Sequence, residues 1–250
     1  MRIHLAGNIA LSMPREYIEL RAPFVLQTFY EAVNWDERTW ADVLTVPKVF
    51  LLDSGAFALF RTGVQGNLDE YLSRYIEAIN RHSVEHFFEL DLDPVIGVEA
   101  TAKLTERLER ETGRQCIPVF HRVRGIDTWR SMCRQYPYVA IGATGLTKES
   151  LWVKNDELLR RLIDIAHESG AEVHGLGYTR LSNINKTVVP FDSVDSSSCL
   201  SGGRYGTVYK FTGTKLISRN SKGRIKDYKI VNRHNIGEWI KMARYKEEHP

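Results

Sequence analysis

The chain has few cysteines, no long apolar run and no leader-like start. Its three cysteines, Cys116, Cys133 and Cys199, are odd in number and include no CxxC pair. This spacing excludes a disulfide scaffold and a zinc knuckle, and it favours a reducing compartment. No apolar run approaches the roughly 18–20 residues of a membrane helix, and the opening MRIHLAGNIA is too short and too polar for a signal peptide. We therefore expect a cytoplasmic protein that makes no membrane contact.

What is present is an ordinary globular composition with an uneven charge. The 250 residues are 43% hydrophobic and 26% charged, which suits one large domain or two small ones. The formal charge of +3 divides unequally, because residues 1–200 carry a net −5 and residues 201–250 a net +8. A basic end on an acidic body fits a polyanionic partner, and it fits equally a solvated cationic surface with no partner.

Short apolar runs alternate with amphipathic stretches along most of the chain. Leu72, Tyr75, Ile76 and Ile79 recur at helical spacing, and Asn67 stands where an N-cap belongs. The predicted strands are residues 3–6, 49–52, 86–92, 116–120, 138–141, 172–176 and 191–194. The predicted helices are residues 68–80, 98–112 and 156–169, with Asp156 as a second N-cap and Gly113 and Gly170 at helix ends.

This alternation predicts an α/β fold with a parallel sheet, either a (β/α)8-type TIM barrel or a close variant. An open doubly wound sheet is the alternative, although no GxGxxG follows the first strand. We expect the barrel to occupy residues 1–203. Residues 204–250 form a basic C-terminal segment that completes or decorates it, with strands at 205–211, 215–218 and 224–231 and a helix at 235–245.

Polar residues follow the predicted strands, at the end where a parallel barrel carries its active site. They include Asp53, His121, His174 and Asp195. Each has a local alternative, since Asp, Ser and Gly also favour caps and turns. Two carboxylates from distant strands are what glycosyl chemistry needs, one for the anomeric carbon and one for a proton. We therefore expect a converging polar site, and no metal, because Cys and His are not clustered.

The segment Glu89–Asp93 alternates acids with leucines. As a strand it would present Glu89, Asp91 and Asp93 on one face. Three acids cannot be buried unpaired without a large cost. They must therefore meet water, a cation such as Arg122 or Lys103, or a ligand such as the N1–H and N2–H edge of guanine.

Five motifs in order resemble those of the tRNA-guanine transglycosylase family. Asp53–Phe57 is similar to the DSGGF/Y signature, Leu90-Asp91 to the guanine-reading LD, and 140–142 to the AIGG turn. His174–Gly177 is similar to the MGVG turn, and Asp195 precedes Arg204-Tyr205-Gly206 at the spacing from the nucleophile to RNG. The stretch 193–206 resembles more closely the short 7-deazaguanine DNA transglycosylases of bacteriophages and bacterial DNA-modification islands.

The resemblance implies exchange of guanine for a 7-deazaguanine, preQ0 (7-cyano-7-deazaguanine), with no cofactor. It makes Asp195 the nucleophile and Asp53 the general acid/base. It also gives a set of base-binding residues: Asp91, Asp93, Phe57, His121, Gly142, His174, Gly175 and Gly177. His121 stands in for a glutamine of the tRNA enzymes, and host cytoplasm is the expected location if a phage encodes the chain.

Two departures favour DNA over tRNA as the partner. The family's zinc site of three cysteines and a histidine has no counterpart, and no RNA-binding module follows the barrel. We expect the basic segment to hold the phosphates through Arg204, Lys210, Lys215, Arg219, Lys222 and Arg224. A base inside a duplex must be flipped out to react. RNA base exchange and a non-catalytic nucleic-acid-binding barrel remain the alternatives, and the oligomeric state stays open.

Overall fold

The computed structural model describes residues 1–9, 14–55, 58, 67–142, 154–178, 180–221 and 225–249, with only the backbone for Glu16 and Arg204. The chain forms two compact units. The first comprises Met1–Leu26, Glu37–Phe50 and Gly177–Pro250, and the second Gln27–Asp36 and Leu51–Leu176. Among the described residues, no helix is both long and apolar enough to cross a membrane.

Strand β1 of the first unit pairs on both sides. It runs from Arg2 to Ala6 between β2 (Phe24–Thr28) and β8 (Ser193–Ser196), parallel to both. Leu5 lies opposite Val25, and His4 lies opposite Asp195. In a TIM barrel the first strand pairs with the eighth, and β1 and β8 make that pairing here.

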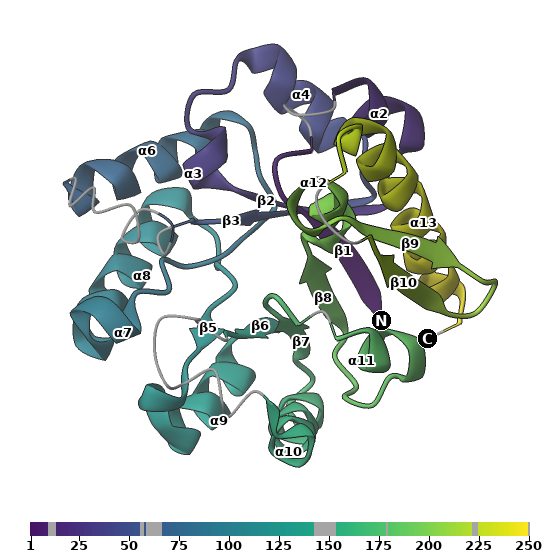
Figure 1. The fold of residues 1–250 in the computed structure, drawn as a ribbon. Coiled ribbons are helices and arrows are strands. Elements are labelled where there is room, and N and C mark those ends of the chain that lie inside the picture. Colours follow the sequence, from purple (N-terminus) through teal and green to yellow (C-terminus); the bar gives the residue numbers. More distant parts are fainter. Residues whose placement is uncertain are drawn as a thin grey trace. The chain divides into compact units, whose positions relative to one another are not determined.

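The other parallel strands lie in the second unit, apart from Val49 and Phe50 of β3, which belong to the first. They are β3 (Val49–Asp53), β4 (His86–Phe87), β5 (Val119–Phe120), β6 (Tyr138–Ile141) and β7 (Glu172–Gly175). β3 pairs with β4, and β6 pairs with both β5 and β7, all in parallel. Phe88 and Ile117 form a parallel bridge just after β4 and just before β5. The fold is therefore of the TIM-barrel-like α/β class, as the strand–helix alternation predicts (Figure 1).

Helices connect the strands, and their apolar faces supply much of the core. In the second unit they are α3 (Phe29–Ala32), α6 (Leu68–Arg81), α7 (Asp93–Ile96), α8 (Val98–Thr112), η1 (Arg122–Arg124), α9 (Gly125–Gln135) and α10 (Asp156–Glu168). In the first unit they are α2 (Pro14–Leu20), α4 (Glu37–Thr45), α11 (Leu181–Lys186), η3 (Ser198–Leu200), α12 (Ser201–Tyr205) and α13 (Tyr228–Glu248).

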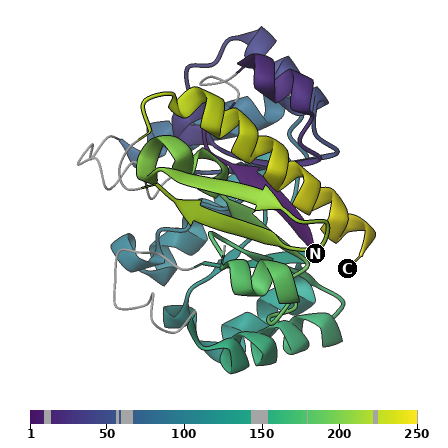
Figure 2. The same ribbon diagram turned by 45° about the vertical axis from the view of Figure 1, so that its right-hand side comes forward.

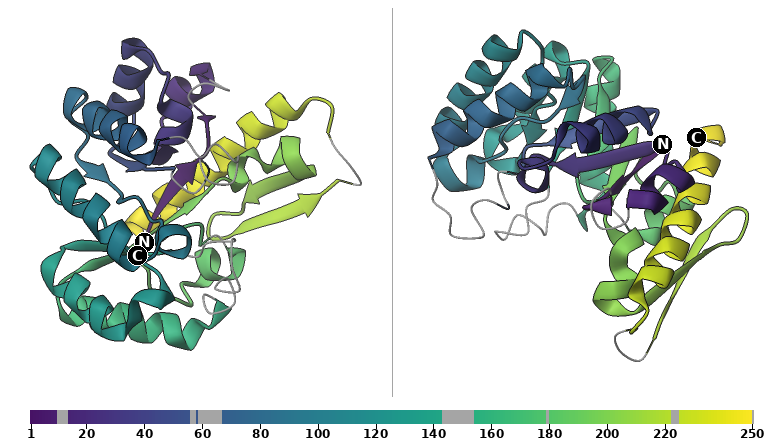
Figure 3. Two further views of the ribbon diagram at one scale, coloured as in Figure 1. Left: turned by 90° about the vertical axis from the view of Figure 1, so that its left-hand side faces the viewer. Right: turned by 90° about the horizontal axis from the view of Figure 1, so that it is seen from above.

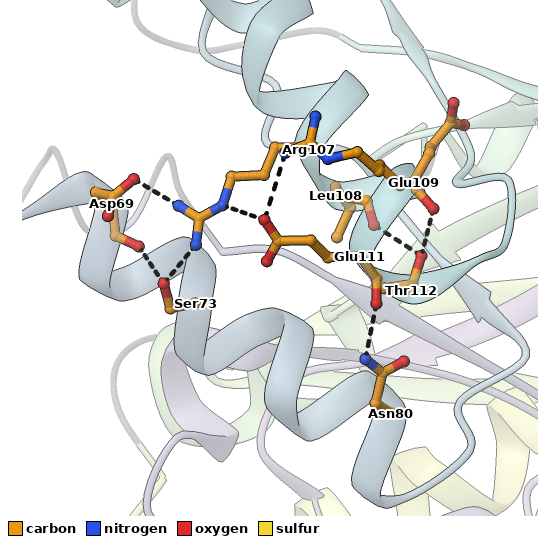
Figure 4. A network of polar contacts seen from close by, with 9 residues as sticks. Asp69, Ser73, Asn80, Arg107, Leu108, Glu109, Glu111 and Thr112 are labelled. Carbon is orange, nitrogen blue, oxygen red and sulfur yellow. Dashed lines mark hydrogen bonds and ion pairs between the residues drawn. The ribbon is translucent and has the colours of Figure 1, made fainter.

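Helix α6 shows how the local sequence positions a helix. Asn67 caps it by accepting hydrogen bonds from the Asp69 and Glu70 amides, and its apolar face is buried. On its exposed side, Arg107 of α8 reaches Asp69 at 2.5 Å and Ser73 at 2.7 Å (Figure 4). The cap fixes the start of α6, and the polar network links α6 to α8 on the exposed side.

Several predicted elements need correction. Residues 224–231 were expected as a strand, but Tyr228 already begins α13, whose buried side chains follow helical spacing. The predicted strand 86–92 ends at Phe87, so the acids beyond it do not share one strand face. The N-cap of α10 is Asn155, one residue before Asp156. Strand β2 was missed because α3 begins immediately after it, with no turn residue to mark the boundary.

The basic C-terminal segment folds as a hairpin backed by α13. Strands β9 (Thr207–Phe211) and β10 (Leu216–Asn220) are antiparallel, and α13 lies alongside them (Figures 2 and 3). Residues 177–250 belong to the same compact unit as β1.

Candidate functional site

A buried ion-pair cluster follows strands β4 and β5 of the second unit. The Arg124 guanidinium lies 2.8 Å from Glu89 and 2.5 Å from Asp93, and all three side chains are almost fully buried. Glu89 also accepts hydrogen bonds from Thr105 and from the Val119 amide, each at 2.6 Å. Burial raises the pKa of Glu89 although Arg124 opposes the shift. The expectation that these acids need partners is confirmed, with Arg124 in place of Arg122 or Lys103.

Asp91 differs from its two acidic neighbours. Its carboxylate is partly exposed and lies 3.5 Å from the Nε2 atom of His121, whose ring is completely buried. Neither ring nitrogen of His121 has a hydrogen-bond partner among the described residues. Buried polar atoms are nearly always paired, so this imidazole has hydrogen-bonding capacity that the described residues leave unused.

Gly142 lies directly over this histidine. A Cβ atom at position 142 would stand 2.8 Å from His121 Cε1 and 2.7 Å from Val119 Cγ1. The glycine after β6 is therefore required by the packing of His121, a reason additional to the predicted approach of a planar ligand. The structure thus brings Asp91, His121 and Gly142 together.

His174 and Gly175 lie in strand β7 and are buried. The His174 ring lies 5.4 Å from the Phe88 ring, centroid to centroid, and its Nδ1 atom is 3.4 Å from the Tyr138 hydroxyl. These contacts fix the imidazole between two aromatic side chains. Asp93, the other acid predicted to bind the base, has its carboxylate engaged by Arg124.

Asp53 ends β3, and the turn after it is bonded by Tyr71 and lies close to Tyr30. The Tyr71 hydroxyl donates to the Ser54 carbonyl at 2.5 Å. Burial raises the pKa of Tyr71, and the Asp53 carboxylate raises it further, so the hydroxyl stays protonated and keeps donating. Gly55 has φ +66°, and a Cβ there would meet the Tyr30 Cβ at 2.6 Å and its backbone nitrogen at 2.9 Å. Both the positive φ and the close approach of Tyr30 therefore require a glycine at position 55.

Asp195 occupies β8 in the first unit. Its side chain is nearly buried, and its Oδ1 atom accepts a hydrogen bond from the Gly177 amide at 2.6 Å. Gly177 adopts φ +65° in a turn with open space around its α-carbon. The backbone amide orients one carboxylate oxygen. The structure thus brings together Asp195 and Gly177, two of the predicted site residues.

Only some of the predicted phosphate-binding residues have described side chains. Lys210, Lys215 and Arg219 are exposed on the hairpin. Arg204 belongs to α12, where only its backbone is described, and Phe57, Lys222 and Arg224 lie outside the described residues. Arg124 was missed by the sequence reasoning. Its only signal is the basic run after β5, and nothing in that run indicates which arginine turns inward.

Neither protein-family models nor curated protein sequences match this chain. Among solved structures, a protein described as a fructose-1,6-biphosphate aldolase from Coccidioides immitis has a TM-score of 0.56 at 11% identity, over 99% of this chain and 88% of that chain. The carboxyl transferase domain of Rhizobium etli pyruvate carboxylase gives a TM-score of 0.46 at 11% identity, over 98% of this chain and 47% of that chain. The first likeness shows the fold alone, and this chain shares the barrel-type fold of such proteins.

Proposed function

We propose that this protein is a glycosyltransferase that exchanges guanine in DNA for preQ0 through a covalent aspartyl intermediate. The observation that carries the proposal is the Asp195 carboxylate, oriented by the Gly177 amide at 2.6 Å on the last strand of a barrel-type fold. A carboxylate held in place at that position is suited to attack a sugar carbon. The motif resemblance supplies the reaction class.

The chemistry balances without an external energy source. An Asp195 oxygen bonds to C1′ of the target deoxyguanosine while the bond from C1′ to N9 of guanine breaks, and Asp53 gives the departing base its proton. The incoming base then loses its N9 proton to Asp53. Its N9 atom bonds to C1′ and displaces the Asp195 oxygen, which restores the carboxylate.

Recognition of the base is assigned to Asp91 and His121. The partly exposed Asp91 carboxylate can accept from the N1–H and N2–H groups of guanine, which preQ0 shares. The buried, unsatisfied His121 ring supports a ligand or a water at this position. Glu89 and Asp93 are both engaged by the single Arg124 guanidinium, which leaves Asp91 as the acid of this segment that is available to a ligand.

The direct test is incorporation of labelled preQ0 into duplex DNA, followed by nucleoside mass spectrometry. Asp195→Asn keeps the shape of the side chain and removes the nucleophile, so we expect incorporation to fall by about a thousandfold or more. Asp192→Asn, three residues earlier, is the matched control. Unreduced incorporation by the Asp195 variant contradicts the assignment, and a covalent adduct mapped to Asp192 moves the nucleophile to that residue. Parallel reactions with single-stranded DNA and tRNA distinguish DNA from RNA exchange.

A further inference from the structure

The β9–β10 hairpin is held rigidly along one edge by α13. Asn235 accepts a hydrogen bond from the Tyr209 amide and donates to the Thr207 carbonyl, both at 2.9 Å. Glu238 accepts from the Phe211 amide at 2.6 Å. The outward-pointing backbone groups of β9 are thereby satisfied by side chains of a helix. The hairpin is a fixed two-stranded ribbon, and it needs no third strand on this edge.

The register places a mixed cationic and apolar surface on the ribbon. Val208 lies opposite Arg219, and Lys210 lies opposite Ile217, so these four alternate positions share one face. Lys210 and Arg219 are exposed, and Ile217 keeps 41% of its surface. A hollow of about 330 Å³ lies here, lined by these four residues with Tyr209, Thr212, Ser218 and His234. We call the four-residue surface the ribbon face.

The stretch of chain that carries this face has charge of one sign. From Ser196 to Lys226 the chain carries seven lysines and arginines and no aspartate or glutamate. Lys210 and Arg219 are diagonal neighbours across the two strands, about 7–8 Å apart at their α-carbons. Two long cationic side chains at that separation, with an apolar centre between them, complement a polyanion that also offers apolar edges.

We propose that the ribbon face docks duplex DNA, with the hairpin in the major groove and Lys210 and Arg219 on the phosphates that flank it. The B-form major groove, about 12 Å wide, admits a two-stranded ribbon, whereas the deep and narrow major groove of A-form RNA does not. This docking surface rests on the proposed function, because it is the surface that would hold the DNA during base exchange. Binding itself needs no base exchange, so the two can fail separately.

Salt dependence of binding tests the proposal. A fluorescent 30-base-pair duplex is titrated with the full chain carrying Asp195→Asn, and the affinity is measured from 50 to 200 mM salt. Each phosphate contact contributes about 0.9 to the slope of log affinity against log salt. Lys210→Ala with Arg219→Ala should reduce the magnitude of this negative slope by about 1.8. The fold-loss of affinity between 50 and 200 mM salt should therefore be about 12-fold smaller than for the parent chain.

A matched control separates the ribbon face from net charge. Arg81→Ala with Arg161→Ala removes the same two charges from exposed positions on α6 and α10, and it should leave the slope unchanged. Equal slopes for both double variants overturn the proposal. So does an equal loss of affinity for tRNA and for the duplex when the Lys210/Arg219 variant is titrated with each. If the Lys210/Arg219 variant loses binding while the wild-type chain, with Asp195 intact, shows no base exchange, the docking surface stands and the proposed reaction fails.

Discussion

Replacement of Arg124 by methionine is the sharpest test of the buried cluster. Methionine retains most of the volume but leaves Glu89 and Asp93 as unpaired buried acids, whose carboxylates lay 2.8 Å and 2.5 Å from the guanidinium. Removing one partner of a buried ion pair costs about 3–5 kcal/mol. Since domains are stable by only about 5–15 kcal/mol, the variant should lose a large part of its free energy of unfolding. Urea denaturation followed by far-ultraviolet circular dichroism measures the loss.

The same variant has a defined pH dependence. Burial raises the pKa of Glu89 above its unfolded value, so its contribution is present at low pH and declines as pH rises through the raised pKa. Loss of Arg124 raises that pKa further, because the guanidinium favours the ionised carboxylate. The deficit of the Arg124→Met variant should therefore be smaller at pH 5 than at pH 8.

The control is Arg107→Met, which removes an arginine with two acidic partners from the exposed network between α6 and α8 (Figure 4). Exposed pairs contribute about 0–1 kcal/mol, so this variant should stay close to wild type. Adding Glu89→Gln and Asp93→Asn to Arg124→Met should recover part of the loss, since neutral amides remove the buried charge. A loss below about 1 kcal/mol, or one that does not shrink at pH 5, refutes the reasoning.

Three further predictions concern stability and are measured by the same unfolding assay. Gly55→Ala should lower the free energy of unfolding by clearly more than Gly113→Ala. Both glycines have φ +66°, but only at position 55 would the added Cβ atom crowd a neighbour, so the loss at position 113 should be about 1–2 kcal/mol. Equal losses would contradict the steric argument. Asn235→Ala should cost about 1–3 kcal/mol, since it strands buried backbone groups of β9, and a neutral result would show that the ribbon does not need this edge. Asn67→Ala should cost about 1 kcal/mol by removing the cap of α6, and an unchanged unfolding midpoint would show that the cap is dispensable.

Much of the fold was predictable because it is written in local patterns. The strand at 138–141, the cap at Asn67 and the helix end at Gly113 all follow from spacing and backbone preference over a few residues. Strand β2 and the start of α13 escaped because their boundary signals are weak. In the β2 case the strand runs directly into a helix, and in the α13 case a short polar–apolar alternation imitates a strand.

The candidate site was predictable only in its composition. The acids after β4 were recognisable as a set that needs partners, but their separate roles were not, because the chain leaves the strand at Phe87. Glu89 and Asp93 turn toward Arg124, and Asp91 toward His121. Those choices depend on which side chains the neighbouring loop supplies.

By itself, the sequence determined the alternation of strands and helices, the positions of the polar strand ends and the acid-free basic run that became the hairpin. These depend on residues close together in the chain. Tertiary structure alone decided that β1 pairs with β8, that His121 lies buried beneath Gly142, and that α13 satisfies the edge of β9. Each of these joins segments distant in sequence, so it follows from packing and long-range hydrogen bonding rather than from local spacing.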